Sequence, residues 1–138
     1  MKKLVYIAAV VLSLQLGCKD DPVTPDKPEN RSPVIFSLTV FPEVVSPSDS
    51  LVVICNAMDQ DADTLVYDWY TSGVVRIKGA LPGLPVLLDT YENSRVFYAP
   101  DSQHAAAPQD TFRVECAVRD VKGGQAVETV SFIVTREP

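Results

Sequence analysis

Alternation between apolar and polar residues is the feature that most limits how this chain folds. It begins after Pro33, and in its clearest stretch, residues 111–119, the apolar positions are Phe112, Val114, Cys116 and Val118. A period of two places successive side chains on opposite faces of a strand, so this stretch predicts a β-strand with one buried face. No stretch carries a sustained helical period, and 11 prolines against 6 glycines favour strands and turns over a helical bundle. We therefore expect an all-β domain.

Turn residues divide this domain into seven predicted strands, at residues 34–41, 50–57, 65–71, 74–78, 94–98, 111–119 and 126–135. Strands of this number and length, in about a hundred residues, resemble an immunoglobulin-like antiparallel sandwich. One segment is irregular: residues 79–93, GALPGLPVLLDTYEN, mix leucines with proline and glycine. It has two interpretations, a short edge strand with a loop packed over the sandwich, or an exposed apolar ridge that contacts a partner.

Three strings extend the likeness over most of the domain: NAMDQDADTLVYDWYTSG, VFYAP and FRVECAVRDVKGG. They resemble the bacterial PKD and related Ig-like modules of secreted proteins. Such modules commonly carry an Ala-x-Asp-x-Asp turn, a Tyr-x-Trp strand, an aromatic-x-Ala-Pro step and a late Asp-x-x-Gly turn. The corresponding residues here are Ala57, Asp59 and Asp61, then Tyr67 and Trp69, then Tyr98, Ala99 and Pro100, and finally Asp120 and Gly123. The Gly-Asp-Gly that follows the tryptophan in typical PKD domains is absent. The resemblance implies an Ig-like, PKD-like sandwich over residues 33–138.

The first 17 residues, MKKLVYIAAVVLSLQLG, have the pattern of an export signal. Two lysines precede a 13-residue apolar run, Leu4 to Leu16, which is shorter than the roughly 20 residues that span a bilayer. The following Gly17-Cys18 resembles the cleavage site of bacterial lipoproteins, which implies that Cys18 is lipidated and becomes the new N-terminus. The alternative is an ordinary signal peptide with a chance cysteine.

Residues 18–32, here called the tether, separate this signal from the domain. They are polar, contain three prolines and show no apolar periodicity, so we expect a disordered, extended segment. At about 3.1 Å per residue it holds the domain roughly 40 Å from a bilayer. Lys19, rather than aspartate, follows the lipidated cysteine, and by resemblance to lipoprotein sorting signals this favours the outer membrane or cell surface over the inner membrane.

Removing Cys18 by lipidation leaves Cys55 and Cys116, in a compartment where disulfides persist. Both cysteines fall on the apolar faces of their strands, and Trp69 lies 14 residues after the first. This Cys…Trp…Cys order resembles the core of immunoglobulin domains, which implies a disulfide between the sheets with the indole packed against it. The alternative is a pair of buried free thiols.

Asp59, Asp61 and Asp63 form the one local concentration of like charge in the sequence. In an Ig-like topology their loop and the turn that begins at Asp120 lie at the same end of the sandwich. Four carboxylates directed inward there are suitable ligands for calcium, the only cofactor that the sequence suggests. Alternatively, aspartates hydrogen-bond to nearby backbone N–H groups and fix tight turns without a metal.

Other chemistry finds little support in the sequence. His104 is the only histidine, in the polar segment QHAAAPQD, so the histidine clusters of copper and zinc sites are excluded. A triad that uses His104 lacks a recognisable nucleophile motif, and a formal charge of −6 argues against binding to nucleic acid. The sequence therefore predicts a non-catalytic envelope lipoprotein for protein or carbohydrate binding, adhesion or structural support. The alternative is an accessory module of a carbohydrate-active enzyme or surface-assembly complex.

Overall fold

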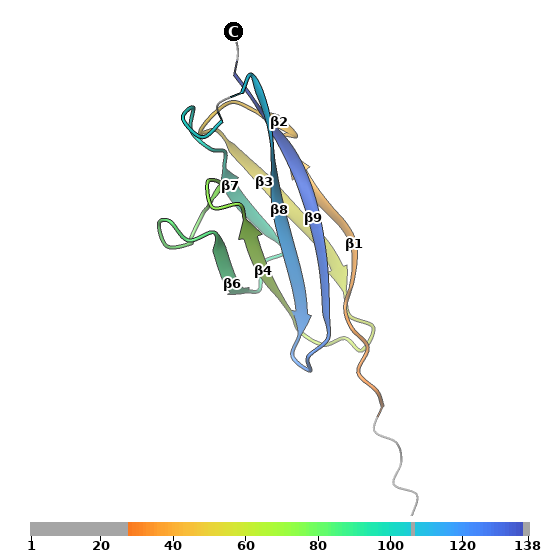
Figure 1. Ribbon diagram of the computed structural model, residues 1–138. Coiled ribbons are helices and arrows are strands. Elements are labelled where there is room, and N and C mark those ends of the chain that lie inside the picture. The colour runs from red at the N-terminus through yellow and green to blue at the C-terminus, as the bar shows by residue number, and fades with distance from the viewer. Residues whose placement is uncertain (1–27, 106, 137–138) are drawn as a thin grey trace, which may run out of the picture.

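The computed structural model describes residues 28–105 and 107–136, which form two β-sheets packed face to face (Figure 1). The nine strands are β1 (Val34–Phe41), β2 (Val44–Val45), β3 (Ser50–Met58), β4 (Leu65–Thr71), β5 (Arg76–Ile77), β6 (Val86–Thr90), β7 (Ser94–Tyr98), β8 (Gln109–Asp120) and β9 (Gln125–Thr135). The predicted signal peptide and Cys18 lie outside the described residues. Within the described part of the chain, no helix has the length and apolar character needed to cross a membrane.

One sheet has the strand order β1-β3-β7-β5 and the other β2-β9-β8-β4-β6. All pairings are antiparallel except that of β2 with β9. The predicted all-β, Ig-like sandwich is therefore confirmed. The seven expected strands are all present, although the fourth is reduced to β5, and two short strands, β2 and β6, are added at the edges of the second sheet.

The β8–β9 hairpin is the most extensive pairing in the fold, with a continuous register from Gln109↔Thr135 to Arg119↔Gln125. Its inward residues Val114, Val118 and Phe132 are almost fully buried, whereas the intervening positions of β8 up to Glu115 are exposed or half-buried. This is the arrangement that the alternation predicts for an antiparallel pair with one face on the core.

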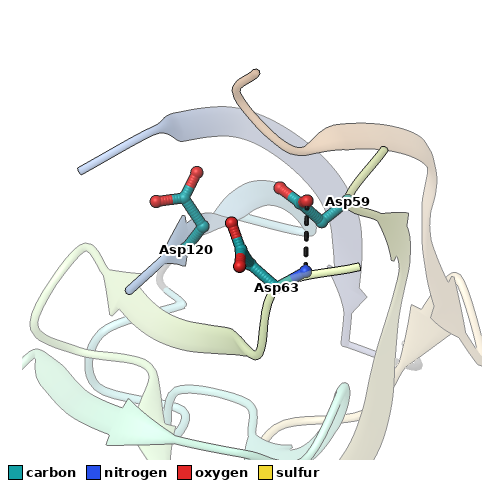
Figure 2. Close-up of side chains that lie close together, drawn as sticks. All are labelled: Asp59, Asp63 and Asp120. Carbon is teal, nitrogen blue, oxygen red and sulfur yellow. Dashed lines mark hydrogen bonds between the residues drawn. The ribbon is translucent and has the colours of Figure 1, made fainter. Parts of the chain in front are cut away.

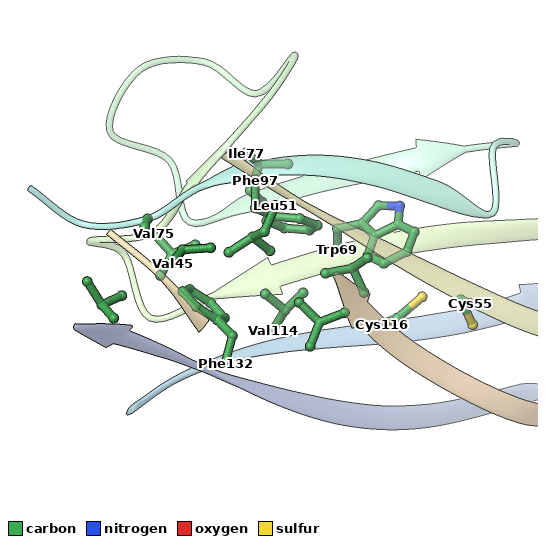
Figure 3. Packing of buried hydrophobic residues seen from close by; sticks show 14 of the residues in the cluster. Val45, Leu51, Cys55, Trp69, Val75, Ile77, Phe97, Val114, Cys116 and Phe132 are labelled. Atoms are coloured by element: carbon green, nitrogen blue, oxygen red, sulfur yellow. The ribbon is translucent and has the colours of Figure 1, made fainter. Parts of the chain in front are cut away.

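Trp69 lies at the centre of the core, between the two sheets (Figure 3). Its ring meets Phe97 of the opposite sheet edge to face, with centroids 5.8 Å apart, an arrangement favoured by the aromatic quadrupole. The indole Nε1 donates a hydrogen bond to Thr90 Oγ1 of β6 at 3.2 Å. Burial of this large side chain therefore leaves its one polar group satisfied.

Cys55 and Cys116 approach each other from opposite sheets, and both are fully buried (Figure 3). Cys116 is also the cross-strand partner of Trp69, so the three residues meet in the core as predicted. The predicted disulfide, however, is not formed in the structure, where both residues are buried free thiols. The neighbouring Cys55 and burial raise the pKa of the Cys116 thiol.

Three charged side chains on the outer face of the second sheet hold its edge strand β6 in place. Asp68 of β4 is buried, with its carboxylate 2.6 Å from Arg119 Nε, while Arg119 also contacts Asp89 of β6 at 2.8 Å. The backbone N–H of Asp89 donates to Asp68 at 2.8 Å. Burial raises the pKa of Asp68, but these hydrogen bonds outweigh it and leave that pKa below its usual value. The contacts pin β6, and with it the end of the preceding loop.

The proximity of the two thiols makes their redox state measurable. Because the chain is predicted to be exported to a compartment where disulfides persist, we expect Cys55 and Cys116 to be oxidised to one another in protein isolated from the envelope. Thiol labelling after unfolding, without reductant, then finds neither cysteine reactive. Labelling of both cysteines, as in protein reduced beforehand, would show that the buried thiol pair of this structure is the native state.

Candidate functional site

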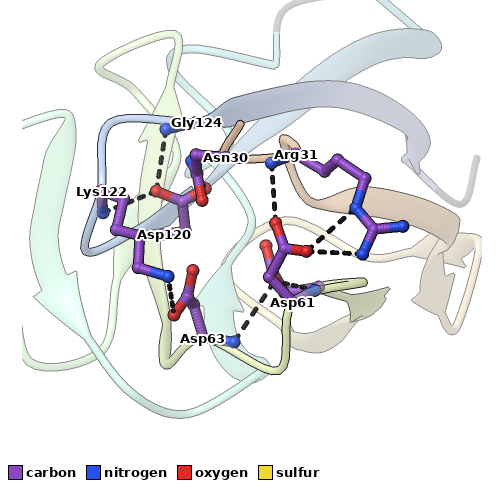
Figure 4. A network of polar contacts seen from close by, with 8 residues as sticks. Asn30, Arg31, Asp61, Asp63, Asp120, Lys122 and Gly124 are labelled. Atoms are coloured by element: carbon purple, nitrogen blue, oxygen red, sulfur yellow. Dashed lines mark hydrogen bonds and ion pairs between the residues drawn. The ribbon is translucent and has the colours of Figure 1, made fainter. Parts of the chain in front are cut away.

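Three segments meet at the end of the sandwich from which the tether emerges. They are the β3–β4 loop, the β8–β9 turn and the residues just before β1 (Figures 1 and 4). The first two carry the aspartates that the sequence singled out. Antiparallel pairing of β4 with β8 sets Leu65 opposite Asp120, so the start of β4 and the end of β8 lie at the same edge.

Asp59, Asp63 and Asp120, here called the acidic cluster, bring carboxylate oxygens within 4.8 Å of one another (Figure 2). Asp59 and Asp120 are only 7% and 4% exposed, and the side chain of Asp63 is 13% exposed. Three carboxylates in so small and buried a volume repel one another, and each has lost most of its hydration. Such a group requires compensation by donors or by a cation.

Part of this compensation comes from the turns themselves. Asp59 Oδ1 accepts hydrogen bonds from the backbone N–H groups of Asp61 and Asp63, at 2.7 and 3.2 Å. Asp120 Oδ1 likewise accepts from Lys122 and Gly124, at 2.7 and 2.8 Å. The turn-fixing alternative of the sequence analysis is thus realised, but it uses only one oxygen of each carboxylate.

The tether contributes further donors, which the sequence analysis did not expect, in addition to Lys122 of the β8–β9 turn, which contacts Asp63 (Figure 4). Asn30 Nδ2 donates to Asp120 Oδ2 at 2.9 Å. The backbone N–H of Arg31 donates to Asp61 Oδ2 at 2.7 Å, and its guanidinium forms a 2.6 Å ion pair with Asp61 Oδ1. Among the described residues, contacts between the tether and the domain therefore include Asn30, three residues before the predicted start of the domain.

These contacts change the predicted ligand set. Asp61 is turned towards Arg31 and is not one of the three residues whose carboxylates converge. Asp120, which comes from the distant turn, does join Asp59 and Asp63, as predicted. The sequence offered no signal for Asn30, because it lies in a polar segment with no periodicity.

Three oxygens at this end remain without a donor among the described residues. They are Asn30 Oδ1, Asp59 Oδ2 and Asp63 Oδ2, all buried. Buried oxygens are normally paired, and oxygens from carboxylates and amides are the ligands that calcium prefers. The cluster therefore has the composition of a hard-cation site in addition to its role in the turns.

Neighbouring hydrogen-bond donors and charged side chains shift the pKa values of three side chains at this end of the sandwich, Asp61, Asp120 and Lys122. The Asn30 side chain and the backbone N–H groups of the β8–β9 turn hold the pKa of Asp120 below its usual value. The backbone N–H and guanidinium of Arg31 do the same for Asp61. Lys122, whose Nζ lies 3.0 Å from Asp63 Oδ1, has a raised pKa because of that carboxylate. The aspartates with lowered pKa values, Asp61 and Asp120, are thus ionised at neutral pH.

A second feature lies beyond the other end of β4. Between β5 and residues 79–84 there is an open hollow of about 290 Å³, here called the basic hollow, bordered by Arg76, Lys78, Tyr98 and Leu84. The irregular segment of the sequence analysis accordingly divides in two: Val86–Thr90 form edge strand β6, while Leu81 and Leu84 in the preceding loop are exposed. The edge strand of the first interpretation is therefore present, and so are exposed apolar residues of the kind that the second required, whose contact with a partner stays a prediction.

His104 is exposed, and its Nδ1 lies 2.7 Å from Asp101 Oδ1, so the pair is formed within one loop. The hydrogen bond from His104 holds the pKa of Asp101 below its usual value. A metal ion could be held by three or more acidic, histidine or cysteine side chains that lie close together. Among the described residues, the acidic cluster is the one group of this kind.

Comparison with solved structures places the domain among β-sandwiches. A structure of promiscuous carbohydrate-binding modules from the β-sandwich superfamily superimposes with a TM-score of 0.55 at 21% identity, covering 78% of this chain and 36% of that chain. The PKD1 domain of Vibrio anguillarum Epp superimposes with a TM-score of 0.49 at 17% identity, and the match covers 79% of this chain and 100% of that domain. A conjugative transposon lipoprotein from Bacteroides eggerthii superimposes with a TM-score of 0.46 at 14% identity, and the match covers 73% of this chain and 94% of that chain. The chain thus spans about a third of the carbohydrate-binding protein. No protein-family model matches the sequence, and no curated protein sequence matches it significantly.

The contact between Asn30 and Asp120 yields a stability prediction. In calcium-free buffer at pH 7, Asn30→Ala lowers the melting temperature by about 5 °C, since it removes a hydrogen bond to a buried carboxylate. Arg31→Ala, whose ion pair is largely exposed, serves as the control and has a smaller effect.

The pH dependence of this difference follows from the lowered pKa of Asp120. The stability that this carboxylate contributes is present above the unfolded pKa of about 3.9, and is lost as the pH falls through the lower folded value. The melting temperatures of the wild type and Asn30→Ala should therefore converge in acid. A difference that is absent at pH 7, or that grows in acid, contradicts the assignment.

Proposed function

We propose that this chain is a non-catalytic, lipid-anchored module of the bacterial cell envelope whose Ig-like domain binds carbohydrate. The observation that carries the proposal is the position of the basic hollow. β4 runs from Leu65, beside Asp120 and the tether, to Thr71, and the loop that forms the hollow follows Thr71 (Figure 1). A domain anchored through its tether therefore presents the hollow away from the anchored end.

Carbohydrate is preferred over protein as the ligand for two reasons. The domain has a β-sandwich fold similar to that of the carbohydrate-binding modules described above, and this reason is an analogy of fold, which the site itself has to support. The hollow also combines apolar walls with a few polar side chains, the usual composition of a small-ligand site. The alternative is that the module belongs to a carbohydrate-active enzyme or a surface-assembly complex and contacts its partner protein.

The direct test uses the mature lipidated chain, displayed on phosphatidylcholine vesicles and applied to an array of bacterial and plant polysaccharides. We expect retention on at least one class of glycan, with vesicles alone as the control. Retention on none, together with specific cross-linking to one envelope protein in the native membrane, would replace the proposal by the accessory-module alternative.

Lipid anchoring rests on the sequence of residues 1–18 and has its own test. Mass spectrometry of the mature protein should find an N-terminal Cys18 that carries at least two acyl chains, because one chain alone anchors only marginally. Cys18→Ser should release the protein from membranes while its domain melts at an unchanged temperature. A wild-type N-terminus beyond residue 18 would exclude the anchor.

We also propose that the acidic cluster binds calcium. The three donor-free oxygens of Asn30, Asp59 and Asp63 support this, together with the burial of Asp59 and Asp120. Asp120, whose carboxylate also lies within the cluster, would supply a further oxygen ligand. A bound ion would offset the mutual repulsion of the carboxylates, and because Asn30 belongs to the tether, it would also strengthen the junction between tether and domain.

Calcium should raise the melting temperature of the full chain relative to the chain in EDTA, because the ion binds the folded state. At a hundred times the dissociation constant the gain in stability is about 2.7 kcal/mol. Asp59→Asn should remove this gain. Asp61→Asn is the matched control, since Asp61 is paired with Arg31 outside the cluster, and it should retain the gain. Melting curves that calcium leaves unmoved would restrict the aspartates to fixing turns.

A further inference from the structure

The basic hollow contains two cations, Arg76 and Lys78, that have no acidic partner in the part of the chain that the structure describes. Arg76 and Lys78 are both exposed and stand two positions apart, on and just after β5, so their side chains leave the same face. Within the described residues, neither has an acidic side chain at the ion-pair distance of 4.0 Å. In a chain of formal charge −6, this local excess of positive charge is unusual.

Arg76 is held in place by an aromatic ring. Its cross-strand partner on β7 is Tyr98, and the guanidinium carbon lies 5.2 Å from the centroid of the Tyr98 ring. At this distance the guanidinium makes a cation–π contact with the ring, and a guanidinium offers planar N–H donors that suit a carboxylate. The hollow therefore offers a carboxylate the guanidinium of Arg76, with the ammonium of Lys78 nearby.

The apolar wall of the hollow is formed in advance by two turns. Leu84 N–H donates to Leu81 O at 3.0 Å across Pro82 and Gly83, and Gly83 has a φ of +81°, as the third position of a type II turn requires. Ala80 N–H donates to Ile77 O at 3.2 Å in a similar turn, with Gly79 at a φ of +93°. The loop is thus shaped by its own backbone before any ligand arrives.

Both ends of the loop are tied to one residue of β4. Thr71 N–H donates to Pro85 O at 2.8 Å, and Thr71 Oγ1 donates to Val75 O at 2.8 Å. Arg76 and Gly83 also border a second open hollow of about 480 Å³ that reaches Asp101 and His104. The surface therefore continues past a single ligand unit, with additional polar groups on the far side of Arg76.

We propose that the basic hollow binds an acidic sugar unit, a uronate within an oligosaccharide. The carboxylate of the uronate would accept hydrogen bonds from the N–H edge of Arg76 and from Lys78, and the C–H face of the ring would pack on Leu81 and Leu84. Adjacent units would extend towards Asp101 and His104. This inference rests on the proposed carbohydrate-binding function and specifies the class of sugar.

The test measures binding of the full mature chain to galacturonate hexamers, to the same hexamers as methyl esters, and to polyglutamate of similar charge. We expect the hexamers to bind and the esters to bind at least about tenfold more weakly, since hydrogen bonds to a charged group are lost. Polyglutamate, which has no sugar ring to pack on the leucines, should bind at least about tenfold more weakly than the hexamers.

Variants locate the binding. Arg76→Gln and Lys78→Gln should each weaken hexamer binding by about tenfold, while Arg76→Lys, which keeps the charge but loses the planar edge, should lose part of the affinity. Arg113→Gln is the matched control, because Arg113 is an exposed arginine on the outer face of the other sheet. It removes the same charge and should leave hexamer binding unchanged. Melting temperatures confirm that each variant is folded.

The possible failures are distinguishable. Equal binding of hexamers and esters overturns the preference for an acidic sugar and leaves carbohydrate binding intact. Equal loss in Arg76→Gln and Arg113→Gln, or polyglutamate binding as tight as that of the hexamers, reduces the effect to general charge attraction and overturns the site. Retention of none of the array polysaccharides, esters or hexamers removes the proposed function together with this inference.

Discussion

The carboxylate of Asp120 joins two parts of the chain that lie far apart in the sequence, the β8–β9 turn and the tether. One oxygen accepts the N–H groups of Lys122 and Gly124 and so closes the β8–β9 hairpin, while the other accepts Asn30 of the tether. Gly124 is required beside it, because a Cβ at this position would overlap the Asp120 carboxylate and lie 2.8 Å from Ser32 Cα. The turn of the longest hairpin and the exit of the tether therefore depend on one buried group.

This arrangement gives the domain two distinct ends. At one end, buried carboxylates and the tether are in contact, so a cation bound there would act on the junction between tether and domain. At the other end, the loop after β4 is shaped by glycine turns and held by Thr71, and this end exposes leucines and two cations that have no acidic partner among the described residues. Between them, the tightly packed core around Trp69 connects the two ends as a rigid unit.

Much of the fold was predictable because its signals are local. The alternation of residues 111–119 gave β8 and its buried face, and the Asp-containing turns were located correctly. The edge strand β6 was only one of two interpretations of residues 79–93, since its sequence, VLLDT, does not alternate and its position depends on the contact of Asp89 with Arg119 and Asp68. Asp68 lies between the core residues Tyr67 and Trp69 in sequence, yet it too is buried, with its carboxylate bound by Arg119 and by the N–H of Asp89 in β6.

For the candidate sites, the sequence by itself determined which residues face the core, where the turns fall and which residue types are present. Only the tertiary structure decided which aspartates converge. Asp61 and Asp63 are two residues apart, yet one turns to Arg31 and the other joins Asp120, because the tether passes beside the first. It also decided that the guanidinium of Arg76 lies over the ring of Tyr98, as β5 pairs with β7 from a distance of about twenty residues along the chain. Periodicity and turn chemistry act between neighbours, whereas these contacts exist only once the sheets have closed.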